Sequence, residues 1–201
     1  MPPRTNPDLS RRALSLRAPS SLNAESRSLR AVISAEQPVD IFDYERWERV
    51  PEVLLADGMQ APANGQVSLL DTHARETVKN VLGSARDFKV VDVSGLRGVE
   101  AAVSFASTPD AMEAFTKLAE GHLTDFSVGY KVLQRVWVER NTTATVNGRT
   151  YAGPVSVVTS WSLRELSAAP IGADDLAKAR AHIHRQGGEH MNMKLRKMLE
   201  A

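Results

Sequence analysis

Ser127 stands out as a candidate nucleophile because of the alternation around it. It lies in the run Thr124-Asp-Phe-Ser-Val-Gly-Tyr130. In an extended segment, Phe126 and Tyr130 would share one face and the hydroxyl of Ser127 would point the other way, into a groove or solvent. Gly129 has no side chain, so a substrate backbone could approach closely beside that hydroxyl. Most serines in strands are ordinary polar residues, so this pattern alone does not decide the role.

His73 ends the extended run Val67-Ser-Leu-Leu-Asp-Thr-His73. Strand alternation predicts that one side of this run is shared by every second residue, namely Val67, Leu69, Asp71 and His73. An imidazole at the polar end of an apolar face can act as a general base near neutral pH. The alternative is an ordinary surface histidine.

Glu165 lies on a strand face that is otherwise largely apolar. In the strand predicted over 155–167, alternation gives one face to Val157, Thr159, Trp161, Leu163, Glu165 and Ser167. A carboxylate buried there without a partner would be costly. Two kinds of partner would satisfy it: an imidazole that the acid orients, as in a serine triad, or an arginine such as Arg75 or Arg164.

Other chemistries find little support in the chain. It contains no cysteine, which excludes disulfides, a thiol nucleophile and thiolate metal ligands. The remaining histidines show no metal-ligand spacing: His122, His182, His184 and His190. Phosphate-loop, dinucleotide and Gly-x-Ser-x-Gly motifs are absent. We therefore expect neither a metal nor a cofactor.

Composition favours one globular domain with appendages. The chain has 201 residues, of which 42% are hydrophobic. Lys and Arg number 25 against 24 Asp and Glu, so global charge gives no reason to expect binding to nucleic acid or membranes. No apolar run has the length of a signal-peptide core or a membrane span. We assign 1–30 to a basic disordered leader, 31–180 to the domain, and 181–201 to a linker and amphipathic helical tail.

Local patterns predict more strands than helices. A hairpin is expected across Ser94-Gly95 and another across Asn147-Gly148. Thr108-Pro109-Asp110 has the composition of a helix start, with Gly121 at the stop, and 173–184 is a second helix candidate. The expected fold is α+β: a β-rich barrel or folded sheet with a few packed helices.

Four short motifs in order carry a resemblance. They are Leu69-Leu-Asp-Thr-His73, Val81-Leu-Gly83, Gly121-His-Leu-Thr-Asp-Phe-Ser-Val-Gly-Tyr130 and Trp161-Ser-Leu-Arg-Glu-Leu-Ser167. Together they resemble the tailed-phage prohead (capsid maturation) protease family, over about Arg30 to Arg180. The resemblance implies a serine endopeptidase with an assemblin-like β-barrel, distantly similar to the herpesvirus maturation proteases.

The resemblance also implies roles for individual residues. His73 and Ser127 match the family's base and nucleophile, and their separation of 54 residues requires the fold to bring them together. Glu165 is carried over as the third member. Herpesvirus relatives use a second histidine there, for which His122 is the alternative. The amides of Val128 and Gly129, assisted by Arg164, are expected to stabilise the oxyanion.

By the same resemblance, the substrates are the scaffold protein and the N-terminal extension of the major capsid protein, cut inside the procapsid in the host cytoplasm. Self-cleavage is expected as well. No direct role with nucleic acid or membranes is implied, and a homo-oligomer is compatible with the sequence. The leader would serve as a tether or a propeptide, or have no selected role. The tail, 191–201, resembles the opening helix of a scaffold extension, which suggests a protease–capsid fusion.

Three other functions stay open on the sequence. One is a catalytically idle capsid-assembly or scaffold-binding module, although an idle copy has no need to retain both His73 and Ser127. A second is the ClpP-like protease of some phages, whose helix-borne serine disagrees with a Ser127 placed on a strand. The third is an unrelated β-barrel binding module.

Overall fold

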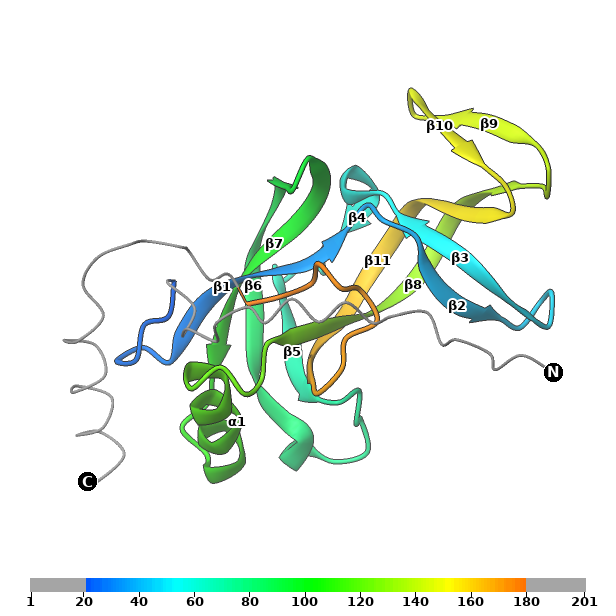
Figure 1. Ribbon diagram of the computed structural model, residues 1–201. Helices are drawn as coiled ribbons and strands as arrows, with labels where there is room; N and C mark the ends of the chain where they lie inside the picture. The colour runs from blue at the N-terminus through cyan, green and yellow to red at the C-terminus, as the bar shows by residue number, and fades with distance from the viewer. Residues whose placement is uncertain (1–20, 180–201) are drawn as a thin grey trace, which may run out of the picture.

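The computed structural model describes residues 21–179 (Figure 1). Its strands are β1 (Ser28–Ala35), β2 (Val39–Asp43), β3 (Glu48–Leu54), β4 (Met59–Gln60), β5 (Gln66–Asp71), β6 (Val81–Val93), β7 (Leu96–Phe105), β8 (Asp125–Val138), β9 (Thr143–Val146), β10 (Arg149–Ala152) and β11 (Val155–Ala169). The helix α1 spans Pro109–Ala119, and single 3₁₀ turns lie at Ala56–Gly58 and Val78–Asn80. The described part of the chain is therefore rich in β-structure, as predicted.

The long strand β11 organises the main sheet. The strand order is β1-β7-β6-β5-β11-β3-β2, and β4 and β8 also pair with β11. β11 runs parallel to β3, β4 and β5 but antiparallel to β8, so the sheet is mixed. Trp161, Leu163 and Leu166 of β11 have no exposed surface and belong to the main hydrophobic core.

The two predicted hairpins are confirmed. Ser94 and Gly95 both have positive φ, 54° and 83°, between β6 and β7. Asn147 and Gly148 also have positive φ, 49° and 78°, between β9 and β10. Two-residue turns of this kind match the twist of paired strands, and Asn and Gly tolerate the left-handed conformation.

The helix α1 is also confirmed where the sequence placed it. Pro109 occupies its first turn, and Gly121 follows its end with φ of 81°. Its buried face contributes Phe115, whose ring lies 5.6 Å from that of Phe105 on β7. This contact holds the helix against β6 and β7 of the sheet (Figure 1).

The expected barrel is wrong. Strand pairing ends at β1 on one side and at β2 on the other, with no closure among residues 21–179. The gap between β1 and β8 is spanned only by residues 177–179, through isolated bridges from Ala179 to Ala31 and from Lys178 to Asp125. A second correction concerns the helices, because 21–179 contains one α-helix where a few were expected.

Two terminal predictions are partly covered by the described residues, and a third lies wholly outside them. Residues 21–30 of the expected leader form a turn, a bridge and the start of β1. Residues 173–179 of the second helix candidate are turns and bridges instead of a helix. The remainder of that helix, the rest of the leader and the amphipathic tail lie outside the described residues.

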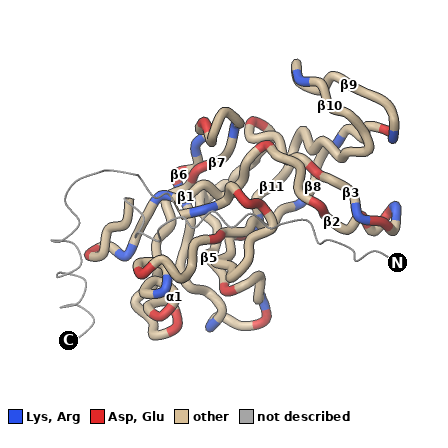
Figure 2. Tube along the Cα trace, viewed as in Figure 1, with Lys and Arg blue, Asp and Glu red and all other residues tan. Residues whose placement is uncertain are grey.

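Charged groups of both signs are spread over the elements of the fold (Figure 2). This distribution agrees with the nearly equal numbers of basic and acidic residues in the chain. Within residues 21–179, no helix is both long enough and apolar enough to cross a bilayer.

Asp125 fastens the segment 172–179 to the sheet. Its carboxylate accepts hydrogen bonds from the Lys178 ammonium at 2.6 Å and from the Gly172 N–H at 3.1 Å. Burial by itself would raise the pKa of Asp125. The hydrogen bonds and the positive charge of Lys178 outweigh it, so the pKa lies below its ordinary value.

We predict that this fastening fails in acid. A group whose pKa is lower in the folded state stabilises the fold above the ordinary carboxyl pKa of 3.8, and this stabilisation is lost as the pH falls through and below it. The amide of Ala179, which donates to the Thr124 carbonyl at 2.9 Å, should lose hydrogen-exchange protection there before the β6–β7 amides do.

The Asp125→Asn variant is the control for this prediction. Ala179 should already be weakly protected in it at neutral pH, with little further change on acidification. Equal protection of Ala179 in both proteins from about pH 7 to about pH 3 would contradict the assigned role.

Candidate active site

The three predicted residues come together around β11. β5 pairs with β11 through Leu69 and Leu166, and His73 follows β5 by two residues. β8 pairs with β11 on the other side, where Ser127 lies opposite Ser167. Since β11 itself carries Glu165, one strand brings together residues that are 92 positions apart in the chain.

The side chains of these residues form a continuous hydrogen-bonded relay. His73 Nε2 lies 2.9 Å from Ser127 Oγ, and His73 Nδ1 lies 2.6 Å from Glu165 Oε1. The Glu165 side chain is 5% exposed, whereas that of His73 is 41% exposed. A solvent-accessible hydroxyl and imidazole thus rest on a buried carboxylate, which is the order of groups in a serine triad.

The backbone at His73 differs from the straight strand that alternation predicted. Thr72 and His73 have φ of 47° and 62°, so the chain leaves β5 through a left-handed turn. This conformation costs about 1–2 kcal/mol per residue for residues other than glycine. Two hydrogen bonds to β11 hold the turn: the Thr72 N–H donates to the Ala168 carbonyl at 3.1 Å, and the His73 N–H donates to Ser167 Oγ at 2.9 Å.

Glu165 has the two partners that the sequence left as alternatives, and a third. Its Oε1 accepts from His73 and also lies 3.3 Å from the Arg75 guanidinium. Its Oε2 accepts from the Ser167 hydroxyl at 2.8 Å. Donors on both oxygens offset the cost of burying the charge.

Gly129 has a different role from the one inferred from sequence. A Cβ at this position would overlap the Glu165 carboxylate, meeting Cδ at 2.6 Å and Cγ at 2.8 Å. Gly129 is also buried. The missing side chain therefore makes room for Glu165 to lie across β8, where the sequence had suggested room for a substrate backbone.

The relay assembles a hydroxyl, a base and an acid in the order that serine peptidases require. The family model of Caudovirus prohead serine proteases matches residues 48–194, a range that includes all three residues. The chain belongs to this family. A search of curated proteins and a search of solved structures each found no match.

In this prohead serine protease, alternation distinguishes the two amides expected to serve the oxyanion. The Phe126 N–H donates to the Ala177 carbonyl, on the side of β8 away from β11. Successive N–H groups of a strand point to opposite edges, so that of Val128 also faces away from β11 and that of Gly129 faces β11. Val128 therefore has the more accessible amide.

The two arginines near Glu165 line a hollow of about 500 Å³ next to the relay. Arg164 lies at an irregularity of β11 between Leu163 and Glu165, and its side chain is exposed. Besides Arg75 and Arg164, the lining residues are Ser68, Leu70, Glu76, Thr77, Val78, Val81 and Glu165. Among the described residues, Arg164 forms no hydrogen bond with Ser127, whose hydroxyl contacts His73, so the assignment of Arg164 to the oxyanion stays a prediction.

His122 is outside the relay. Its contact is with Glu120, at 3.7 Å, and its side chain is 67% exposed. His182, His184 and His190 lie outside the described residues. Within 21–179, no three His, Asp or Glu side chains are grouped as metal ligands.

Sequence reasoning missed Ser167 as part of the site. The residue was placed on the same strand face as Glu165, and that spacing of two was the available signal, because residues two apart on a strand are neighbours. Its second contact, with the His73 backbone, depends on the pairing of β5 with β11 and has no local signal.

We predict that Gly129→Ala disables the relay while leaving the sheet intact. The three atoms nearest to the new methyl group all belong to the Glu165 side chain, so that side chain must shift, including the Oε1 that accepts from His73. Displacements of about 1 Å can cost 10²-fold in rate. The reaction rate of Ser127 with a fluorophosphonate, which phosphonylates activated serines with loss of fluoride, should fall by about that factor.

A double variant separates this clash from a general effect. Gly129→Ala combined with Glu165→Ala removes the overlap, so thermal stability should recover relative to Gly129→Ala while reactivity stays low. Wild-type reactivity in Gly129→Ala would show that the packing of Glu165 on β8 is unimportant.

Proposed function

We propose that Ser127, His73 and Glu165 are the nucleophile, the general base and the orienting acid of this peptidase. The observation that carries the proposal is the relay itself, with contacts of 2.9 Å and 2.6 Å across the two nitrogens of one imidazole. An acid on Nδ1 fixes the tautomer in which Nε2 is free to accept the serine proton.

Acylation follows from this geometry. The Ser127 Oγ attacks the scissile carbonyl carbon while His73 Nε2 takes the hydroxyl proton. The carbonyl oxygen becomes an oxyanion, which the Val128 amide is placed to stabilise at the accessible edge of β8. The tetrahedral intermediate collapses, the C–N bond breaks, and His73 returns its proton to the leaving amine.

Deacylation uses the same groups on water. His73 takes a proton from a water molecule, whose oxygen attacks the acyl-serine ester. Collapse of the second intermediate breaks the ester bond, releases the new carboxyl terminus and returns the proton to Ser127. Glu165 stabilises the imidazolium in both halves and needs no proton of its own.

The substrates we propose are the scaffold protein and the N-terminal extension of the major capsid protein, cleaved inside the procapsid, with self-cleavage in addition. Membership of the prohead protease family supports this proposal. In this proposal, residues 31–180 are the protease domain and residues 1–30 are a leader. Residues 181–201 are a linker and a tail that opens a scaffold or capsid extension.

Co-expression with the cognate capsid and scaffold proteins tests the two central residues. Ser127→Ala and His73→Ala should each abolish cleavage, because the first removes the nucleophile and the second the base. His122→Ala, an exposed histidine outside the relay, should cleave like the wild type. Cleavage that persists in both relay variants would refute the assignment.

Glu165→Gln and Arg75→Gln test the third member as a pair. If Glu165 orients His73, its amide variant should lose about 10⁴-fold in turnover. Arg75 is 62% exposed, and exposed ion pairs contribute about 0–1 kcal/mol, so Arg75→Gln should lose less than about tenfold. Equal losses in the two variants would mean that the Glu165–Arg75 ion pair is the important contact.

A further inference from the structure

We propose that Ser167 is a positioning residue that fixes the general base and the acid relative to each other. This inference rests on the proposed function of His73 and Glu165. Ser167 has no exposed surface, and although it lies opposite Ser127 in the sheet, its hydroxyl bonds to His73 and Glu165 and not to the nucleophile. The effect of the hydroxyl would therefore pass through the two residues that it joins.

The hydrogen-bonding capacity of the hydroxyl defines its orientation. Ser167 Oγ accepts from the His73 N–H at 2.9 Å, which uses one lone pair. A carboxylate can only accept, so the single hydroxyl proton of Ser167 must point to Glu165 Oε2, 2.8 Å away. One hydroxyl thus connects the backbone of His73 with the side chain of Glu165.

Each of these contacts restrains a different degree of freedom. The contact with Glu165 holds Oε2 on β11, which leaves Oε1 facing His73 Nδ1. The contact with the His73 N–H holds the left-handed turn, which places the imidazole above that oxygen. Without the hydroxyl, the carboxylate could rotate and the turn would lose one of its two attachments to β11.

The position of Ser167 in the sheet suits this role. On β11 it lies between Leu70 of β5 and Ser127 of β8. Ser167 is therefore a direct neighbour both of β5, which leads to His73, and of β8, which carries Ser127. Because Ser167 has no exposed surface, a larger side chain would have to displace its neighbours.

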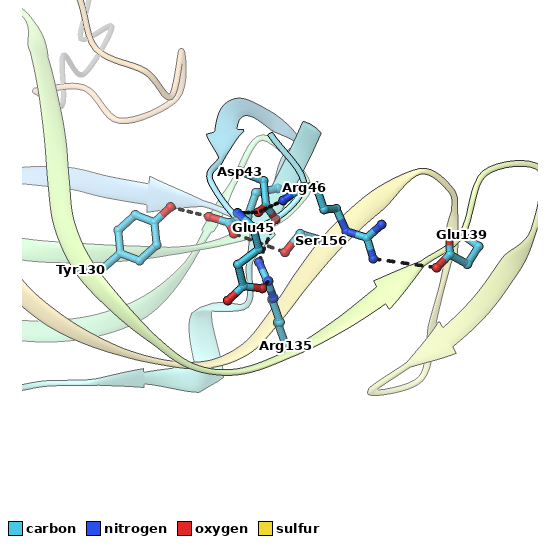
Figure 3. A network of polar contacts seen from close by, with 8 residues as sticks. Asp43, Glu45, Arg46, Tyr130, Arg135, Glu139 and Ser156 are labelled. Atoms are coloured by element: carbon cyan, nitrogen blue, oxygen red, sulfur yellow. Dashed lines mark hydrogen bonds and ion pairs between the residues drawn. The ribbon is translucent and has the colours of Figure 1, made fainter. Parts of the chain in front are cut away.

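Ser156 provides a matched control on the same strand. It is also fully buried, and its hydroxyl lies 3.2 Å from Oε2 of another buried carboxylate, Glu52 (Figure 3). The other oxygen of Glu52 accepts from the Tyr130 hydroxyl. Burial and the charge of Glu52 raise the pKa of Tyr130, which keeps this donor protonated.

The two alanine variants therefore remove the same kind of contact at different places. Ser167→Ala and Ser156→Ala each delete one hydroxyl from β11 and one hydrogen bond to a buried glutamate. Both leave a carboxylate oxygen with one donor fewer, and Ser167→Ala also removes the acceptor of the His73 N–H, so its loss of thermal stability should be at least as large as that of Ser156→Ala. Only Ser167→Ala should alter the reactivity of Ser127.

The test uses a rhodamine-tagged fluorophosphonate on the full-length chain. The labelling rate is measured at several probe concentrations, which gives the maximal rate and the probe concentration at half-saturation. In Ser167→Ala we expect the maximal rate to fall about 100-fold, with half-saturation unchanged within about threefold. Ser156→Ala should keep both values within about threefold of the wild type. Wild-type labelling in Ser167→Ala, or equal losses in the two variants, would overturn the proposal.

A second measurement distinguishes this inference from the proposed function. The imidazole N–H proton that bridges His73 and Glu165 should give a downfield NMR signal, assigned by its absence in His73→Gln. Ser167→Ala should broaden or shift this signal, and Ser156→Ala should not. If the wild type neither labels nor cleaves, the proposed function fails; an unchanged signal in Ser167→Ala refutes the positioning role independently.

Discussion

The site depends on one buried carboxylate. Glu165 could not lie 5% exposed inside the sheet unless donors reached both of its oxygens. These donors come from the loop after β5, which supplies His73 and Arg75, and from Ser167 on β11 itself. β8 contributes space through Gly129. Residues on β8 and β11 and in the loop after β5 thus all surround the Glu165 carboxylate.

The central position of β11 follows from this arrangement. Its parallel pairing with β5 and its antiparallel pairing with β8 bring the end of β5 and the start of β8 to the same residues of β11. An isolated hairpin could not achieve this, because β5, which leads to His73, and β8, which carries Ser127, do not pair with each other within residues 21–179. Strain at Thr72 and His73 is tolerated because β11 supplies the hydrogen bonds that fix the turn.

Sequence alone predicted the elements that local chemistry determines. The turns at Ser94-Gly95 and Asn147-Gly148, the start of α1 at Pro109 and the alternation around Ser127 all have their cause within a few residues. Sequence missed the features that arise between strands. The open sheet, the left-handed turn at His73 and the role of Gly129 depend on which strands pair, and that information is not local.

β11 is the last strand of residues 21–179, so during synthesis the site can be completed only after the other strands have been made. Ser127 and His73 are synthesised before Glu165 and Ser167, so a growing chain contains the proposed nucleophile and base before the residues that align them. Domains fold as units once their final elements are available. Alignment of the relay would then coincide with completion of the sheet, and partly synthesised chains would be unable to attack their neighbours.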